Sequence, residues 1–235
     1  MKTTTTKMIL GLILTSAVIA AASSARAEVI GGIEFPQGML SFADRVDYYN
    51  PSIMTDPTNG LDSPDIRWRN PADALGAPNY TPPTTNIHNV GQFVSLGNGG
   101  ELVLRFVDNR LTGNGNAGDD LYIFEVGPVV ESTNVWISQN GQGWMFVGTI
   151  QGSTRGIDID PYLVTAGLPY TTQFAVVMLA DVYSDSFGYG FVSGADIDAV
   201  GAISSVPEPA TLMLLGVAGT MLVIRRRNRK NTLSL

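Results

Sequence analysis

Acidic side chains within glycine- and asparagine-rich stretches are the residues of this sequence best suited to binding chemistry. Asp119 and Asp120 follow a glycine-rich stretch at residues 113–118, and Asp196 and Asp198 lie in the last apolar stretch before a proline-containing tail. Carboxylate and carbonyl oxygens are the ligands that calcium prefers, and loops of this composition supply both. On an extended strand, residues two apart such as Asp196 and Asp198 point to the same side. Two interpretations stay open: calcium ligands, or ordinary solvated carboxylates in turns.

The stretch at residues 113–118 also has the spacing G-x-G-x-x-G, which occurs in dinucleotide-binding sites. Such a site requires a helix directly after the glycines, because the helix N-terminus meets the pyrophosphate. Here Asp119 and Asp120 follow instead, and then an apolar run that is typical of a strand. Two carboxylates at that point would repel phosphate, so the stretch is interpreted as a hairpin loop.

Residue types that commonly carry catalysis are scarce. The chain has no cysteine and a single histidine, His88, so thiolate chemistry and a two-histidine zinc site are excluded. A Ser-His-Asp arrangement would depend entirely on His88, and the motif G-x-S-x-G is absent. A pair of carboxylates could hydrolyse glycosides, but 21 acidic residues make close pairs common. We therefore expect no catalytic residues, with a glycoside-active enzyme as the minor alternative.

The net charge of −7 conceals a strong asymmetry along the chain. Residues 28–205 contain no lysine, and their six arginines stand against 20 acidic residues, a balance of −14. A domain this acidic would repel nucleic acid and anionic lipid headgroups. The sequence thus excludes nucleic acid as a partner. It is compatible with divalent cations, neutral sugars or a charge that serves solubility alone.

The N-terminus has the parts of a secretory signal peptide in the right order. Lys2 and Lys7 precede an uncharged apolar run at residues 8–22, and Ala25 and Ala27 give the small-x-small pattern that signal peptidase accepts. The apolar run is shorter than the ~20 residues that span a bilayer. Residues 1–27 are therefore predicted to be a signal peptide that signal peptidase removes after Ala27.

The C-terminus combines three features. A rigid extended element comes first, because proline fixes its own φ and disfavours helix in the residue before it. An uncharged, mostly apolar run at residues 210–224 follows, and then a basic block. The extended element consists of Pro207, Glu208 and Pro209, and the basic block begins with Arg225, Arg226 and Arg227.

These three parts in this order resemble the PEP-CTERM sorting signal of Gram-negative bacteria. The resemblance implies that residues 206–230 form a sorting segment whose short transmembrane helix holds the protein in the membrane before processing. It also implies cleavage at or near the Pro-Glu-Pro motif by an exosortase-type membrane protease. The protein would then pass from an inner-membrane intermediate to the cell surface or extracellular matrix. An ordinary single-span tail anchor is the alternative.

The middle of the chain, residues 28–205, is predicted to be one all-β domain, a jelly roll or β-sandwich. Turn residues recur at short intervals, and no apolar pattern of period 3.6 lasts a dozen residues. An Asn-Gly turn at residues 139–143 predicts a hairpin. Residues 28–70 are less regular and are expected to be rich in loops. Strands are predicted at residues 93–96, 102–107, 121–126, 135–138, 145–150, 174–181 and 197–203.

A second resemblance rests on the order of five short stretches, at residues 74–79, 94–100, 119–126, 135–144 and 194–200. Their succession is similar to the galactose-binding-like (discoidin-type) jelly roll of secreted cell-surface proteins. The chain departs from that family by lacking its disulfide and by offering few aromatic residues for a sugar platform. The resemblance implies a structural calcium ion between an early loop and the last strand. It would place Asp73 or Asn79 opposite Asp196 or Asp198.

Sugar binding would need aromatic faces and polar groups that converge in a loop cleft. Tyr183, Phe187 and Tyr189 alternate with glycine and serine and form the candidate binding loop, whereas Trp136 and Trp144 are expected in the core. Together with the sorting signal, these features favour a non-catalytic surface or matrix module that contacts exopolysaccharide. A purely structural surface protein without a ligand site is the alternative.

Overall fold

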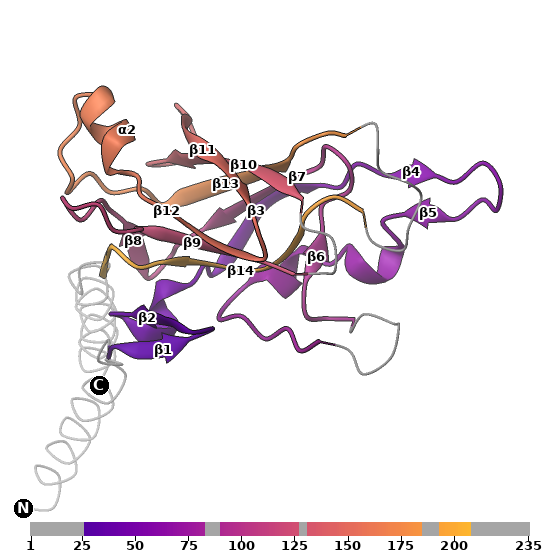
Figure 1. Ribbon diagram of the computed structural model, residues 1–235, viewed down its shortest axis with the longest axis horizontal. Helices are drawn as coiled ribbons and strands as arrows, with labels where there is room; N and C mark the ends of the chain where they lie inside the picture. The colour runs from indigo at the N-terminus through magenta and orange to yellow at the C-terminus, as the bar shows by residue number, and fades with distance from the viewer. Residues whose placement is uncertain (1–25, 83–89, 127–130, 185–192, 208–235) are drawn as a thin grey trace, which may run out of the picture.

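Residues 26–82, 90–126, 131–184 and 193–207 are described by the computed structural model, and they form a sandwich of two antiparallel β sheets (Figure 1). Each sheet packs one apolar face against the other, which removes that surface from water. The predicted all-β class is therefore confirmed.

The larger sheet has five strands in the order β11-β10-β13-β7-β3. Every pairing in it is antiparallel, and β10 and β11 form the hairpin that the Asn-Gly turn predicts. Successive side chains of a strand point to opposite faces, so Val135 and Ile137 are buried while Asn134 and Trp136 on the other face are partly exposed. In sheet order, the strands span Met145–Gln151, Ser132–Ser138, Val176–Asp181, Glu101–Arg105 and Arg45–Asn50.

The smaller sheet has four strands in the order β12-β9-β14-β6. All residues of β14 are buried, and Phe35 and Phe42 cover its outer side. A Cβ at Gly201 would lie only 2.7 and 2.8 Å from these two rings, so glycine lets them pack directly on the strand. In sheet order, the strands span Thr154–Ile157, Leu121–Glu125, Asp196–Ala202 and Val94–Ser95.

Short elements surround the sandwich. Three two-stranded ladders pair β1 with β2, β4 with β5, and β8 with β15. Their strands are Glu28–Ile30, Ile33–Phe35, Met54–Thr55, Asp62–Ser63, Asn109–Leu111 and Ser205–Pro207. The 3-10 helices η1, η2 and η3 span Gly38–Ser41, Ile66–Trp68 and Pro71–Ala74, and the helix α2 spans Asp160–Thr165.

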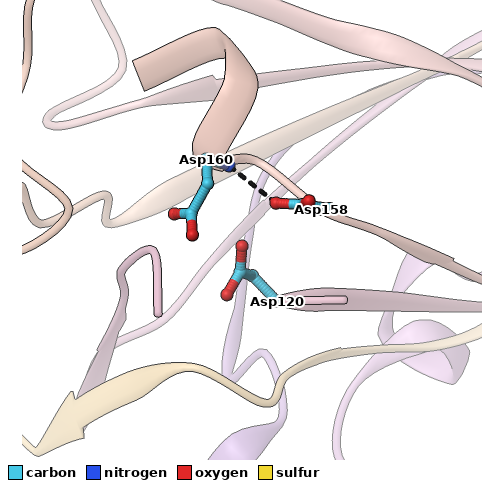
Figure 2. Close-up of side chains that lie close together, drawn as sticks. All are labelled: Asp120, Asp158 and Asp160. Carbon is cyan, nitrogen blue, oxygen red and sulfur yellow. Dashed lines mark hydrogen bonds between the residues drawn. The ribbon is translucent and has the colours of Figure 1, made fainter. Parts of the chain in front are cut away.

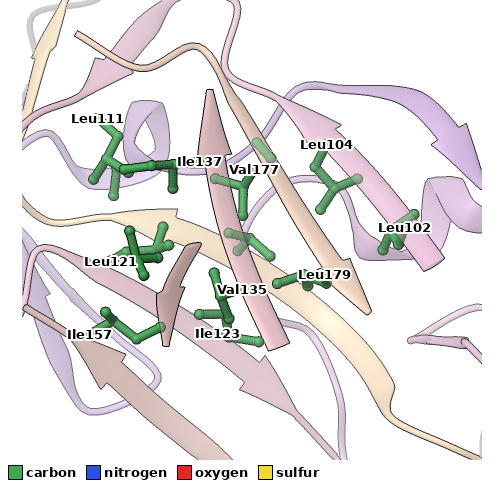
Figure 3. Close-up of a cluster of buried hydrophobic side chains, with 14 of the residues drawn as sticks. Leu102, Leu104, Leu111, Leu121, Ile123, Val135, Ile137, Ile157, Val177 and Leu179 are labelled. Carbon is green, nitrogen blue, oxygen red and sulfur yellow. The ribbon is translucent and has the colours of Figure 1, made fainter. Parts of the chain in front are cut away.

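The core lies between the two sheets, and Figure 3 shows its centre. Each fully buried aliphatic side chain contributes about 1.5–3 kcal/mol relative to an exposed one. Residues of the larger sheet and of the smaller sheet belong to one continuous cluster. Among its fully buried members are Leu102, Leu104, Leu121, Ile123, Val135, Ile137, Val177, Leu179 and Val200.

All seven predicted strands are present, with ends that shift by up to three residues. The loop-rich expectation for residues 28–70 is wrong in part, because this segment supplies β3, an edge strand of the larger sheet. β3 carries Arg45 and Asp47 and has a bulge between Val46 and Tyr48, so it lacks the clean alternation of an inner strand.

Within the described ranges, no helix is both long and apolar enough to cross a membrane. The predicted signal peptide at residues 1–27 falls almost wholly outside those ranges, and so does the predicted transmembrane run at residues 210–224.

A pair of carboxyl groups is buried at one end of the sandwich. Glu125 ends β9 and Glu131 precedes β10, and they are only 1% and 8% exposed. Burial, together with the neighbouring Glu131 carboxyl group, raises the pKa of Glu125 to about 9. Burial also raises the pKa of Glu131 to about 7, and the negative charge of Asp181 adds to the effect. The Glu125–Glu131 pair therefore retains a proton at neutral pH.

This pair predicts that the protein loses stability as the pH rises in the presence of a chelator. A carboxyl group whose folded-state pKa is raised contributes stability in full below its unfolded pKa of about 4.3. That contribution is lost as the pH rises through the folded-state values of about 7 and about 9. We expect the free energy of unfolding in urea to fall by up to about 1.4 kcal/mol per pH unit for each retained proton. Glu125→Gln should flatten this slope.

Glu34→Gln is the control, because Glu34 is an exposed glutamate of β2. Its slope of stability against pH should match that of the wild type. A wild-type protein whose stability is constant or increases between about pH 6 and pH 9 would contradict the raised pKa values.

Candidate functional site

Three aspartates converge beside the end of the smaller sheet (Figure 2). Asp120 directly precedes β9, Asp158 directly follows β12, and Asp160 begins α2. One carboxylate oxygen from each lies within 4.8 Å of the other two. Within the described part of the chain, this aspartate triad is the one group of three or more acidic or histidine side chains with the spacing of metal ligands.

Backbone hydrogen bonds hold the triad in place. The amide of Ile159 donates to Asp120 Oδ2 at 3.0 Å, and the amide of Asp160 donates to Asp158 Oδ1 at 2.9 Å. The amide of Asp120 in turn donates to the carbonyl of Ile157 at 2.9 Å. The carboxylates of Asp120 and Asp158 are thus oriented by backbone amides of the turn between β12 and α2.

The triad concentrates negative charge where water has little access. Asp120 is fully buried and Asp160 is 6% exposed. Asp120 Oδ1 and both carboxylate oxygens of Asp160 have no hydrogen-bond partner. Burial raises the pKa of Asp120 to about 6, and the charges of Asp160 and Asp158 add to this effect. A bound proton or cation would reduce the electrostatic repulsion among these carboxylates.

A hollow of about 490 Å³ opens beside the triad. Asp158 and Asp160 both line it, and Asp158 is partly exposed to solvent. Tyr170, which is 42% exposed, forms part of the wall and packs over Gly115. The residues that line the hollow are Gly115, Asn116, Ala117, Asp158, Asp160, Pro161, Val164 and Tyr170.

Only one of the two adjacent aspartates at this position joins the triad. Asp119 accepts a hydrogen bond from the hydroxyl of Tyr122 at 2.9 Å, whereas Asp120 faces Asp158 and Asp160. Asp158 and Asp160 were not among the site residues predicted from the sequence. The sequence feature that could have identified them is the spacing of two aspartates two residues apart, directly before Pro161.

The early loop and the last strand do come together, as the second resemblance implied. Asp198 accepts hydrogen bonds from the amides of Asn79 at 3.0 Å and Tyr80 at 3.1 Å. These N–H groups engage both oxygens of the carboxylate. Asp73 accepts a hydrogen bond from the side chain of Asn70 at 2.7 Å, and burial raises its pKa.

Asp196 and Asp198 meet different partners. The register of β14 against β9 shifts between Ile197 and Ala199, which makes Asp198 the extra residue of a β-bulge. Asp196 is 4% exposed, and burial raises its pKa, with the charges of Glu131 and Asp181 adding to the effect. Burial and the charge of Asp196 raise the pKa of Tyr80, whose amide donates to Asp198, so both aspartates lie near this residue. That they point to the same side stays a prediction.

The predicted aromatic loop is described in part. Tyr183 is 63% exposed and lies against Gly99, where an added Cβ would be 3.5 Å from its ring. Phe187 and Tyr189 lie outside the described residues.

The core placement expected for Trp136 and Trp144 is wrong. Trp136 is partly exposed on the outer face of the larger sheet, and its ring centroid lies 5.3 Å from that of Phe146. Trp144 is partly buried in a small separate cluster with Val103. The tryptophan that is buried is Trp68, at 1% exposure. The alternation of β10 was the missed signal, because inward Val135 and Ile137 place Trp136 outward.

Trp136 belongs to a row of side chains that crosses the whole sheet. Strand register aligns one residue from each strand on the outer face. Phe146 and Tyr48 at the two ends are 45% and 50% exposed. We call this set the outer-face row; in sheet order it consists of Phe146, Trp136, Met178, Val103 and Tyr48.

Polar groups flank the outer-face row. On one side, the hydroxyl of Thr149 donates to the amide oxygen of Asn134 at 2.5 Å. On the other side, Asp47 forms ion pairs with Arg45 and Arg105. The two arginines therefore share one carboxylate, which offsets one of their two positive charges.

The solved structures that match this chain include two proteins of low sequence identity. The C-terminal domain of a chitobiase from Bacteroides fragilis is 11% identical, with a TM-score of 0.26; the match covers 43% of this chain and 62% of that domain. The protein CpGH89CBM32-6, produced by Clostridium perfringens, is 7% identical, with a TM-score of 0.29; the match covers 67% of this chain and 94% of that protein. The search of curated proteins finds no match.

The C-terminal segment gives a direct family match. Residues 205–230 match the PEP-CTERM protein-sorting motif, in agreement with the predicted boundaries of 206–230. This motif indicates export, processing at the membrane and display on the cell surface. The chain thus carries a PEP-CTERM protein-sorting motif and is an exported surface protein.

Proposed function

We propose that the β sandwich is a non-catalytic module that binds a neutral glycan, such as an exopolysaccharide of the extracellular matrix, through the outer-face row. The observation that carries this proposal is the alignment of three aromatic side chains, Phe146, Trp136 and Tyr48, on the outer face of the larger sheet. Phe146 and Tyr48 are exposed and Trp136 is partly exposed, whereas Val103 between them is buried. Exposed apolar side chains that gather on one face commonly mark an interaction site.

The chemistry of the row suits a sugar. Phe146, Trp136 and Tyr48 present large apolar faces, against which the C–H groups of a sugar ring can pack. The amide of Asn134 and the hydroxyl of Thr149 border the row and offer hydrogen bonds to sugar hydroxyls. Strands lie about 4.8 Å apart, so a row across five strands extends for about 19 Å, enough for a short oligosaccharide.

Charge favours a neutral glycan over an anionic one. Residues 28–205 carry a balance of −14 and contain no lysine. Arg45 and Arg105 beside the row already pair with Asp47. A polyanionic ligand would meet net repulsion from the module as a whole.

The proposal does not include catalysis. Glycoside hydrolases place two carboxyl groups about 5–9.5 Å apart on either side of the scissile bond. The oxygens of the aspartate triad lie within 4.8 Å of one another, and Asp120 Oδ2 already accepts an amide hydrogen. This spacing favours a shared cation over a separate acid and base.

Export would place the module at the cell surface or in the matrix, where the proposed glycan ligand is found. The sorting motif implies processing by an exosortase. We propose that this processing takes place in a Gram-negative cell, where signal peptidase first removes residues 1–27. The apolar run at residues 210–224 would then hold the protein in the inner membrane as an intermediate. Processing would then deliver the sandwich to the outer surface or the matrix.

Trp136→Ala should weaken glycan binding at least about tenfold, because aromatic anchors commonly contribute more than about 1.4 kcal/mol to binding. Isothermal titration with polysaccharide from the producing cell and a glycan array would measure the effect. Trp136→Phe should retain most of the affinity.

Tyr183→Ala is the matched control for Trp136→Ala, since Tyr183 is an exposed aromatic residue of the alternative loop site. Circular dichroism should show that both variants stay folded. If only Tyr183→Ala lost binding, the result would indicate that the glycan binds at the loop and not at the outer-face row. A wild-type protein that binds no glycan on the array would support the purely structural alternative.

Replacement of Pro207, Glu208 and Pro209 by alanine should block processing. The expected product is a longer, membrane-associated form, because the apolar run and basic block stay attached. Intact mass spectrometry of membrane and surface fractions would detect it. Alanine at Asn231 and Thr232, beyond the matched residues 205–230, is the control and should leave processing unchanged. Normal processing of the triple variant would count against cleavage directed by this motif.

A further inference from the structure

The aspartate triad has the size of a coordination sphere. Calcium binds oxygen at about 2.3–2.6 Å, so two of its ligand atoms lie at most about 5 Å apart. Oxygens of Asp120, Asp158 and Asp160 all fall within 4.8 Å of one another. A single ion could therefore contact all three without rearrangement of the backbone.

Buried, unpartnered oxygens are a second observation that points to a ligand. Asp120 is 0% exposed and Asp160 is 6% exposed. Asp120 Oδ1, Asp160 Oδ1 and Asp160 Oδ2 accept no hydrogen bond, and Figure 2 shows the two carboxylates pointing toward each other. An uncompensated buried charge is costly, so carboxylates in this position require a positive partner or a proton.

The surroundings keep the site open. A Cβ at Gly113 would lie 2.0 Å from Asp160 Oδ1, so glycine at this position makes room for the carboxylate. Two further oxygens, Asp120 Oδ2 and Asp158 Oδ1, already accept hydrogen bonds from the amides of Ile159 and Asp160. Two of the three ligand side chains are therefore held in place in advance, which reduces the conformational entropy that binding must overcome.

Solvent can reach the site from one side. Asp158 and Asp160 line the hollow of about 490 Å³, which gives an entry path and room for water ligands. Calcium accepts six to eight oxygen ligands in flexible geometry, whereas magnesium demands a near-ideal octahedron of shorter bonds. Three carboxylates from two chain segments, completed by water, suit the larger ion.

We propose that the aspartate triad is a calcium site, with Asp120 as its buried ligand and Asp158 and Asp160 as ligands on the side of the hollow. The ion neutralises the carboxylates and ties the start of β9 to the connection between β12 and α2. This proposal is independent of glycan binding, because the outer-face row lies on the other sheet.

Calcium titration of the mature protein, first stripped of metal with a chelator, tests the proposal. We expect one saturable site per chain by isothermal titration calorimetry. The dissociation constant should fall at or below the ~10⁻³ M that marks the weak limit of extracellular calcium modules. Calcium in excess should also raise the unfolding temperature by a few degrees, because it binds only the folded state. Magnesium should have a smaller effect at the same concentration.

Asp160→Asn and Asp158→Asn are the informative variants. Each keeps the shape of the side chain and removes one negative charge, so each should weaken calcium binding at least tenfold and reduce the thermal shift. Asp119→Asn is the matched control, since it removes the same charge one residue from Asp120 but outside the triad. It should bind calcium as the wild type does.

Three outcomes would contradict the proposed calcium site. The first is a folded wild-type protein that shows neither heat of binding nor a thermal shift with calcium. The second is equal calcium affinity in the wild type and in Asp160→Asn. The third is a loss in Asp119→Asn as large as that in Asp160→Asn, which would indicate a general charge effect.

Discussion

Burial of one face of each sheet is the constraint on which the rest of this structure depends. A strand sends successive side chains to opposite faces, so every inward residue fixes the direction of its neighbours. On β10, inward Val135 and Ile137 leave Trp136 on the outer face, and strand register then aligns it with Phe146 and Met178. The core and the outer-face row are therefore two results of the same alternation.

Much of the fold could be predicted from local sequence, because a short apolar run between turn residues is enough to indicate a strand. All seven predicted strands exist, whereas β3 of the larger sheet and β12 of the smaller sheet were not predicted. A bulge and charged residues break the alternation of β3. The site was harder to predict, since Asp120 meets Asp158 and Asp160 only after β9 and β12 pair. No spacing within the chain encodes that pairing.

A lysine-free domain must stabilise its buried carboxylates by other means than ammonium groups, and the structure offers three. Asp181 and Asp198 each accept two backbone amides, from Gly99 and Ala195 and from Asn79 and Tyr80. The Glu125–Glu131 pair lacks such donors for Glu125, and it retains a proton. The aspartate triad has amides for only some of its oxygens and opens to a hollow, where a cation can enter. The hydrogen-bond donors near each buried carboxylate thus determine whether backbone amides, a proton or a metal ion stabilises it.

The sorting motif is structurally joined to the sandwich. Its match begins at Ser205, and Ser205–Pro207 form β15, which pairs with β8. Gln37 also donates its side-chain amide to the carbonyl and hydroxyl of Ser205. The first three residues of the matched segment, Ser205–Pro207, therefore belong to the folded domain. A protease that cleaved at Pro207 would have to work on a residue that pairs with β8, so folding of the domain and access to this bond would be physically coupled.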